Sequence, residues 1–289
     1  MVATSTIEVR TIHDRRARLR RLGERAALWF SILVIVSPAI LVFLWMLSLA
    51  FKNEIDNMSY PPALWPSEPT LGNFTSTFER SPFGLYTVNS LIVSGTATIL
   101  ALIVGVPAGY GVAKSKMQGL AAFVLISRMT PALSFLIPLF ILFKSIGLTG
   151  TLGALIITHL VITVPIVVWI MIGFFEDLHP DLEEAALVDG CDILGAFLYI
   201  NMPLARPGIV VSGILAFIFS WNNFIFGVVL AGRETRTLPV AVYNSLTYEQ
   251  VSWGPLAAAA LIVTLPVLLL TVFFQKYIVT GLAAGGVKG

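Results

Sequence analysis

Four long stretches of this sequence contain no charged residue, and they constrain the fold more than any other feature. They cover residues 26–51, 86–113, 207–232 and 251–275. Each is longer than the about 20 residues with which an apolar helix crosses a bilayer. With 57% apolar and 12% charged residues, the chain has too much apolar surface for a soluble globule of its length. We therefore predict an integral membrane protein.

Two further apolar stretches complete the predicted set of spans. They cover about 119–143, which Arg128 interrupts, and 153–175. None of the stretches has the alternation of membrane β-strands, so we predict an all-α polytopic membrane protein with six transmembrane helices. Pro131 and Pro138 each remove a backbone hydrogen bond, which predicts a bent third helix. The net charge of +2 says nothing about nucleic acid, but the sequence has no basic patch with interleaved aromatics. We therefore expect the lipid bilayer and no nucleic acid as partner.

The amino terminus, residues 1–25, is rich in arginine and directly precedes the first span. Such a segment favours retention in the cytoplasm, and the following apolar run is too long for a signal peptide and lacks a small-residue cleavage site. Six spans then put both termini in the cytoplasm, with a six-span transmembrane domain at 26–280 and a short tail at 281–289. The predicted location is the bacterial cytoplasmic (inner) membrane. The arginines are Arg10, Arg15, Arg16, Arg18, Arg20, Arg21 and Arg25.

The longest polar gap on the predicted cytoplasmic side, about 177–203, has the pattern of a short helix, a bend and a second helix. Pro180 suits the first turn of a helix. Negative charge in that turn complements the helix dipole. The acidic residues there are Asp181, Glu183 and Glu184.

The second half of this loop contains the bend and the next helix. Gly190 supplies a stop for the first helix, and Asp192 can cap a second helix that runs to about Ile200. We expect Pro203 to end that helix. A solvated amphipathic surface helix is the simpler interpretation of the first half, but the spacing of the small residues favours a loop that another protein grips.

That spacing is specific. It reads Glu184-Ala185-Ala186, three residues, Gly190, nine residues, Ile200, one residue, Met202-Pro203. It resembles the coupling-loop signature of ABC importer permeases, in which Leu stands where this chain has Met202, a volume-conserving change.

The resemblance extends over most of the chain, to the carbohydrate-uptake branch and its MalG-like subunits of maltose-type transporters. One feature of that branch is absent, because Asn223 stands where an acidic residue is common. The matching segments are Ala108-Gly109-Tyr110 before Lys114, Arg128-Met129 before Pro131, Ser220-Trp221-Asn222-Asn223-Phe224, and Gly281-Leu282 to Val287-Lys288-Gly289.

The resemblance implies a type I ABC importer permease architecture and a transport function for a sugar or sugar-like solute. It implies a homologous second permease subunit, two ATPase subunits that hold ATP and Mg, and an extracytoplasmic solute-binding protein. This chain would have no cofactor and no catalytic residue of its own. The implied contact with the ATPases is carried by Glu184, Ala185, Ala186, Asp189 and Gly190.

Polar residues inside the spans are candidates for the substrate pathway. Trp221, Asn222 and Asn223 lie toward the outer half of the fifth span, and Asn89 lies near the outer end of the second. Amides beside an aromatic ring suit a sugar, whose hydroxyls they can bind. Hydrogen bonding between helices explains the same residues, because an unpaired amide in hydrocarbon is costly.

Arg128 is the charge inside a predicted span, near the bilayer midplane. Its guanidinium could extend toward the cytoplasm, cap carbonyls freed by Pro131, pair with an acid of the companion subunit, or meet an anionic group of the solute. We favour a structural role over a substrate-specific one.

Other function classes have less support. A secondary transporter or channel without an ATPase is the alternative, but proton or sodium coupling needs intramembrane acids, and no Asp or Glu lies in a predicted span. An intramembrane enzyme would need neighbouring catalytic groups at depth. The single cysteine, Cys191, excludes an intrachain disulfide and a cysteine-cluster metal site. The sequence has no Gly-Lys dipeptide for a phosphate loop.

Overall fold

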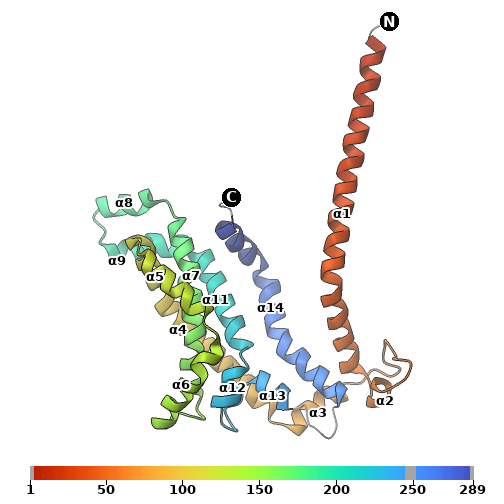
Figure 1. The fold of residues 1–289 in the computed structure, drawn as a ribbon, viewed down its shortest axis with the longest axis vertical. Coiled ribbons are helices and arrows are strands. Elements are labelled where there is room, and N and C mark those ends of the chain that lie inside the picture. Colours follow the sequence, from red (N-terminus) through yellow and green to blue (C-terminus); the bar gives the residue numbers. More distant parts are fainter. Residues whose placement is uncertain (1–2, 245–251, 287–289) are drawn as a thin grey trace.

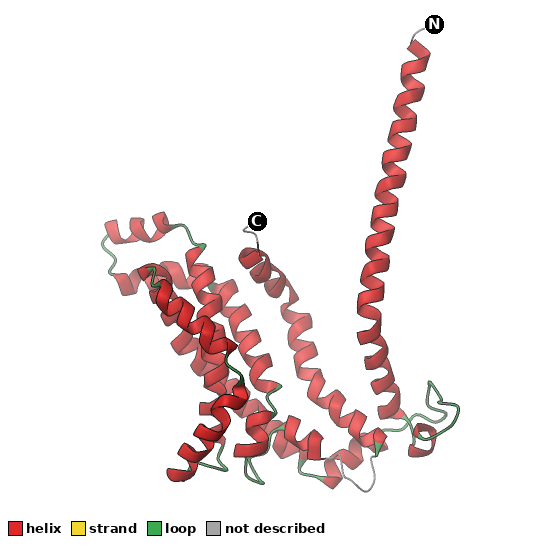
Figure 2. Cartoon of the chain, in the orientation of Figure 1, coloured by secondary structure: helices red, strands yellow, loops and turns green. Residues whose placement is uncertain are grey.

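A computed structural model describes residues 3–244 and 252–286, which form helices joined by loops (Figures 1 and 2). Within these ranges there is no strand, and four continuous helices contain spans long and apolar enough to cross a membrane. The all-α prediction is confirmed. The four helices are α1 (Ala3–Phe51), α4 (Phe83–Ser115), α7 (Leu152–Glu176) and α14 (Trp253–Gly286).

The third predicted span is a bent pair of helices. α5 (Gln118–Met129) and α6 (Ala132–Ser145) meet at 86°. The bend lies at Thr130 and Pro131, because the residue before a proline is driven out of the α region. Thr130 accordingly has an extended backbone, with ψ 126°.

The fifth predicted span differs from the expected continuous run over 207–232. A helical segment at Ile193–Leu204 leads into α11 (Arg206–Trp221) through a bend of 74°. α11 ends at Trp221, and α12 (Ile225–Leu230) follows after a break. An unbroken helix over 207–232 is therefore wrong, since the amide-containing residues after Trp221 interrupt it.

The short helices gather at the two ends of the bundle (Figure 1). α8 and α9 lie at the end that also holds the start of α1 and the end of α14, which we call the α8 end. α2, α3 and α13 lie at the opposite end, the α13 end. These elements are α2 (Glu54–Asn57), α3 (Gly72–Arg80), α8 (Pro180–Val188), α9 (Ile193–Ala196), the π-helical turn η1 (Phe197–Asn201), α10 (Met202–Leu204) and α13 (Leu238–Asn244).

Both predicted terminal segments continue a long helix where the structure describes them. Residues 3–25 belong to α1, and residues 281–286 belong to α14. Residues 287–289 of the predicted tail lie outside the described residues. The division of the chain at 25 and 281 therefore stays a prediction from charge and hydropathy.

The core of the bundle is the close contact of α4 with α7, which α11 covers. Small residues allow this contact, as is usual for helices in membranes. A Cβ added at Gly105 would stand 2.7 Å from Cγ1 of Val167, and one at Gly109 would stand 2.6 Å from Cβ of Met171. On α11, a Cβ at Gly208 would stand 2.5 Å from the ring of Phe174. These three approaches fix the relative positions of α4, α7 and α11.

α14 joins this core toward the α13 end and also contacts α1 there. The indole Nε1 of Trp221 donates to the carbonyl oxygen of Val263 on α14 at 2.9 Å. Ala257 and Ala258 of α14 are buried with Ala50 of α1. Nearer the α8 end, the apolar side chains of α1 are exposed, such as Trp29 at 68%.

The connection between α1 and α3, residues 52–71, is an ordered loop that includes α2. Lys52 is buried, donates to the carbonyl oxygen of Ala63, and lies over the ring of Trp45 at 4.5 Å. Asp56 accepts hydrogen bonds from the hydroxyl (2.7 Å) and the N–H (3.0 Å) of Ser67. These bonds hold the pKa of Asp56 below its ordinary value.

The glycine contact makes a testable prediction. Gly109→Ala should lower the thermal stability of the purified protein, because the added Cβ collides with Met171, and overpacking costs about 1–3 kcal/mol. Gly111→Ala is the matched control on the same helix, since no atom lies within 4 Å of its added Cβ. We expect it to keep or raise the melting temperature, as alanine favours helix over glycine. Equal melting temperatures for the two variants would contradict the proposed packing.

Candidate functional site

The predicted helix–bend–helix is present at the α8 end. α8 begins with Pro180 in its first turn, with Asp181 and Glu183 as acidic residues there. It ends before Gly190, which has φ +95°. This left-handed conformation is one that glycine adopts without steric cost. The sequence was therefore sufficient to predict the first helix and its bend.

The second helix departs from the prediction at its end. Asp192 caps it as expected, accepting a hydrogen bond from the N–H of Gly195 at 2.7 Å. Pro203 was predicted to end it, and this is wrong. The helix passes through the π-helical turn, Pro203 lies in the first turn of α10, and the bend follows at Ala205. Proline is tolerated in a first turn because its missing N–H is not needed there.

Most residues predicted to contact the ATPases are exposed. Glu184, Ala185, Asp189 and Gly190 lie on the surface, and Ala186 is buried beneath them. Large apolar side chains continue this surface across both short helices. Those exposed are Leu182, Leu187, Val188, Ile193 and Leu194.

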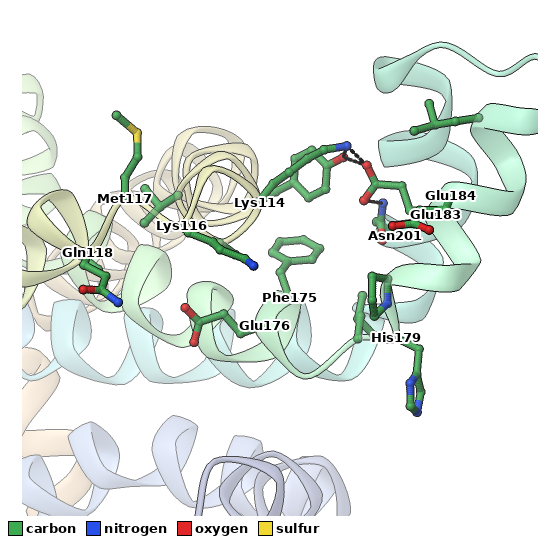
Figure 3. Close-up of a pocket in the computed structure, with 17 residues that line it drawn as sticks. Lys114, Lys116, Met117, Gln118, Phe175, Glu176, His179, Glu183, Glu184 and Asn201 are labelled. Atoms are coloured by element: carbon green, nitrogen blue, oxygen red, sulfur yellow. Dashed lines mark hydrogen bonds and ion pairs between the residues drawn. The ribbon is translucent and has the colours of Figure 1, made fainter.

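Glu183, next to the predicted contact residues, faces the bundle instead. Its Oε1 accepts a hydrogen bond from the hydroxyl of Tyr110 at 2.8 Å, and its Oε2 accepts one from Nδ2 of Asn201 at 3.1 Å. Lys114 forms an ion pair with the same carboxylate. Figure 3 shows Lys114, Glu183 and Asn201 converging from three elements. We call these four residues, Tyr110, Lys114, Glu183 and Asn201, the Glu183 cluster.

Two aromatic side chains pack against the Tyr110 ring of this cluster. The ring of Tyr110 lies 4.7 Å from that of Phe197 and 5.4 Å from that of Phe175, measured between centroids. Phe197 and Asn201 are the first and last residues of the π-helical turn. A cavity of about 750 Å³ lies beside the cluster, between the end of α4, the start of α5 and α8.

Trp221, Asn222 and Asn223 lie at the break between α11 and α12. Trp221 is buried and bonded to α14 as described above. The Oδ1 of Asn223 accepts a hydrogen bond from the N–H of Phe226 at 3.2 Å, so it caps α12. Asn222 is exposed, and its side-chain amide forms no hydrogen bond with a described residue.

The structure separates the other two pathway candidates. Asn89 is buried on α4, and its Nδ2 donates to the carbonyl oxygens of Glu234 (2.7 Å) and Arg236 (3.0 Å). Arg128 lies in the last turn of α5, exposed at the 86° bend. Among the described residues it has no hydrogen bond or ion pair, including with the carbonyls near Pro131.

A buried histidine lies close to the α11–α12 break. Nδ1 of His159 on α7 lies 2.7 Å from the hydroxyl oxygen of Ser220, the residue before Trp221. Its Nε2 has no hydrogen-bond partner among the described residues. These residues also contain no group of three His, Cys, Asp or Glu that could hold a metal ion.

Comparison with known families gives this architecture its context. The family model described as "Binding-protein-dependent transport system inner membrane component" matches residues 97–283. The chain belongs to this family. The match includes α8, α9 and the Glu183 cluster, so the chain is an ABC importer permease and a multi-pass inner-membrane protein. This favours the permease over a secondary transporter or an intramembrane enzyme.

Curated relatives resemble the permease over most of its length. It is 34% identical to the trehalose transport system permease protein SugB of Mycobacterium tuberculosis, covering 93% of this chain and 100% of that protein. It is also 34% identical to the sulfoquinovosyl glycerol transport system permease protein SmoH of Agrobacterium fabrum, over 85% and 88%. The trehalose/maltose transport system permease protein MalG of Thermococcus litoralis is 31% identical, over 86% and 91%.

Solved structures confirm the type I ABC importer permease fold. A bacterial ABC transporter involved in the import of the acidic polysaccharide alginate matches with a TM-score of 0.72 and 20% identity, over 90% of this chain and 96% of that one. The MetNI methionine ABC transporter matches with a TM-score of 0.57 and 17% identity, over 78% and 99%. At these identities the likeness concerns the fold alone.

Sequence reasoning missed two parts of the permease's site, the Glu183 cluster and the His159–Ser220 pair. Part of the cluster has a signal, because Tyr110 and Lys114 are four residues apart and so share one helix face. Glu183 and Asn201 have none, since their pairing depends on the bend at Gly190 and on the π-helical turn.

Proposed function

We propose that this permease forms, with a homologous second permease subunit, the translocation pathway for a sugar or sugar-like solute. Two ATPase subunits that bind ATP and Mg would drive it, and an extracytoplasmic solute-binding protein would deliver the solute. The named solutes of the relatives support the substrate class, since they include trehalose and sulfoquinovosyl glycerol. This chain supplies no cofactor site in the proposal.

The observation that carries the proposal is the exposed surface of α8 and α9 with its glycine bend. Small residues and apolar side chains lie on the outside there, at the end of the bundle where both described chain ends lie. The arginines of residues 1–25 favour the cytoplasm for this end. We therefore assign the α8 end to the ATPase subunits and the α13 end to the solute-binding protein.

Coupling in this proposal is mechanical. When the ATPases close on ATP, they push on α8, and the spans change between outward-facing and inward-facing arrangements. Glu184, Ala185, Asp189 and Gly190 are placed to touch the ATPase. Ala186 packs inward and lets α8 lie close to the bundle.

Two substitutions test this assignment. Gly190→Pro should uncouple ATP hydrolysis from uptake, because proline cannot adopt φ +95°. Glu184→Lys should do the same by reversing an exposed charge. Uptake and ATPase rates are measured in reconstituted complexes, with Gly173→Ala as control, since its added Cβ meets no atom within 4 Å. If both test variants take up solute at the unsubstituted rate, the assignment of α8 as the contact with the ATPases is wrong.

For the substrate pathway, we propose Asn222 and Arg128 as the polar groups available to the solute or to the companion subunit. Both are exposed in the single subunit, and neither uses its side-chain donors on a described residue. Trp221, Asn223 and Asn89 already have partners that hold the fold. Arg128 needs water, an acid of the companion subunit or an anionic solute as a partner in the assembled membrane complex, because an unpaired charge at the bilayer centre costs at least about 2.5–3.5 kcal/mol.

The pathway assignment predicts a division between stability and transport. Asn222→Ala and Arg128→Gln should reduce or alter uptake with little change in the melting temperature of the isolated subunit. Asn89→Ala should lower that temperature, since removing a donor from two carbonyls costs about 1–3 kcal/mol. Uptake is measured for neutral and acidic sugars, so that selective loss of acidic sugars in Arg128→Gln assigns Arg128 to the solute. A destabilised Asn222→Ala with unchanged uptake would reverse the assignment of Asn222.

A further inference from the structure

Two neighbouring glutamates on α8, Glu183 and Glu184, differ in their exposure to solvent. Consecutive residues of an α-helix point about 100° apart, so Glu184 lies on the surface while the side chain of Glu183 is only 16% exposed. The exposed carboxylate is free to meet another protein. The covered one is committed to contacts within the permease.

Among the described residues, the polar partners of the Glu183 side chain are two residues of α4 and one of the π-helical turn. Tyr110 and Lys114 lie in the last turns of α4, and Asn201 closes the π-helical turn that leads to α11. One oxygen of the Glu183 carboxylate thus accepts a hydrogen bond from α4, and the other accepts one from the π-helical turn that precedes α11. A charged acceptor with charged and neutral donors forms stronger hydrogen bonds than a neutral pair.

The backbone of α8 does not itself pack closely on α4. Its main neighbours are the π-helical turn and α9. The link between α8 and α4 therefore depends on side chains, and the Glu183 cluster supplies hydrogen bonds and an ion pair at that place. Polar contacts of this kind transmit a pull only while both partners are present.

The α4 side of the link is firmly held. Tyr110 packs between Phe175 and Phe197, and Gly109, its neighbour, is in close contact with Met171 of α7. A displacement of Tyr110 and Lys114 must therefore move α4 with α7. The cluster connects a surface helix to the most tightly packed pair of spans.

We propose that Glu183 is the positioning residue that carries movement of α8 into the bundle, by holding Lys114 and Tyr110 of α4 and Asn201 of the π-helical turn that precedes α11. This inference rests on the proposed function, in which the ATPases move α8. It assigns the two glutamates different tasks. Glu184 meets the ATPase, and Glu183 attaches α8 to the spans that must move.

The experiment uses the full reconstituted complex and measures distances between pairs of nitroxide labels. Cys191, the free exposed cysteine, is first replaced by serine. One pair joins Val188 of α8 with Phe273 of α14, and the other joins Gly111 of α4 with Phe273. Val188 and Phe273 are exposed, and Gly111 has open space beside it. Distances are recorded without nucleotide and with ATP, Mg²⁺ and vanadate.

In the unsubstituted complex, both distances should shift on nucleotide trapping. In Glu183→Gln and in Lys114→Met, the α8 distance should still shift while the α4 shift is lost. The charge-swapped double variant, Glu183→Lys with Lys114→Glu, should recover the α4 shift. Glu176→Gln is the matched control, because its exposed carboxylate lines the same cavity, and it should behave as the unsubstituted complex.

The outcomes distinguish a failure of the role proposed for Glu183 from a failure of the proposed transport function. An α4 shift that persists in both Glu183→Gln and Lys114→Met overturns the role of Glu183 and leaves the proposed function intact. If the ATPases copurify with Glu183→Gln as with the unsubstituted permease, loss of the α4 shift cannot come from failed assembly. An unsubstituted complex without any nucleotide-dependent shift contradicts the proposed function, and the inference about Glu183 with it.

Discussion

Gly105 and Gly109 let α4 lie directly against α7, and the polar contacts near both ends of α4 take their positions from this packing. A side chain at either glycine would enter space that Val167 or Met171 fills. Toward the α8 end, the same helix then presents Tyr110 and Lys114 to Glu183. Toward the α13 end, it presents Asn89 and Ser90 to the segment before α13. Small residues that permit close helix packing thus also determine where the polar groups lie.

The two ends of the bundle are attached by different chemistry. At the α13 end, α4 holds α13 and the segment before it through main-chain groups, as where the hydroxyl of Ser90 accepts a hydrogen bond from the N–H of Leu238 at 2.7 Å. At the α8 end, the surface helix is attached through the side chains of the Glu183 cluster. An attachment made by a few side chains can transmit force from a partner while α8 keeps its own helical structure. In our proposal, the ATPases move α8 while the α13 end of the bundle stays fixed.

The parts of the structure that sequence could predict are those set by local rules. Apolar runs predicted the continuous spans in α1, α4, α7 and α14, but not the break after Trp221. Pro180 and Gly190 predicted α8 and its bend, and Asp192 predicted a cap. The prediction that Pro203 ends the second helix was wrong, because the effect of a proline depends on whether it lies inside a helix or in the first turn of the next one. The Glu183 cluster depends on contacts between residues distant in sequence. Nothing local to Glu183 distinguishes it from Glu184.

The central claim is that ATPase subunits grip α8, and site-specific cross-linking tests it directly. Val188 of α8 and Ile55 at the α13 end are 86% and 84% exposed, so cysteines at either position, with Cys191 replaced by serine, are equally accessible. After treatment of the purified complex with a thiol-to-amine cross-linker, the account predicts an ATPase adduct from position 188 and none from position 55. An adduct from position 55 alone would contradict it.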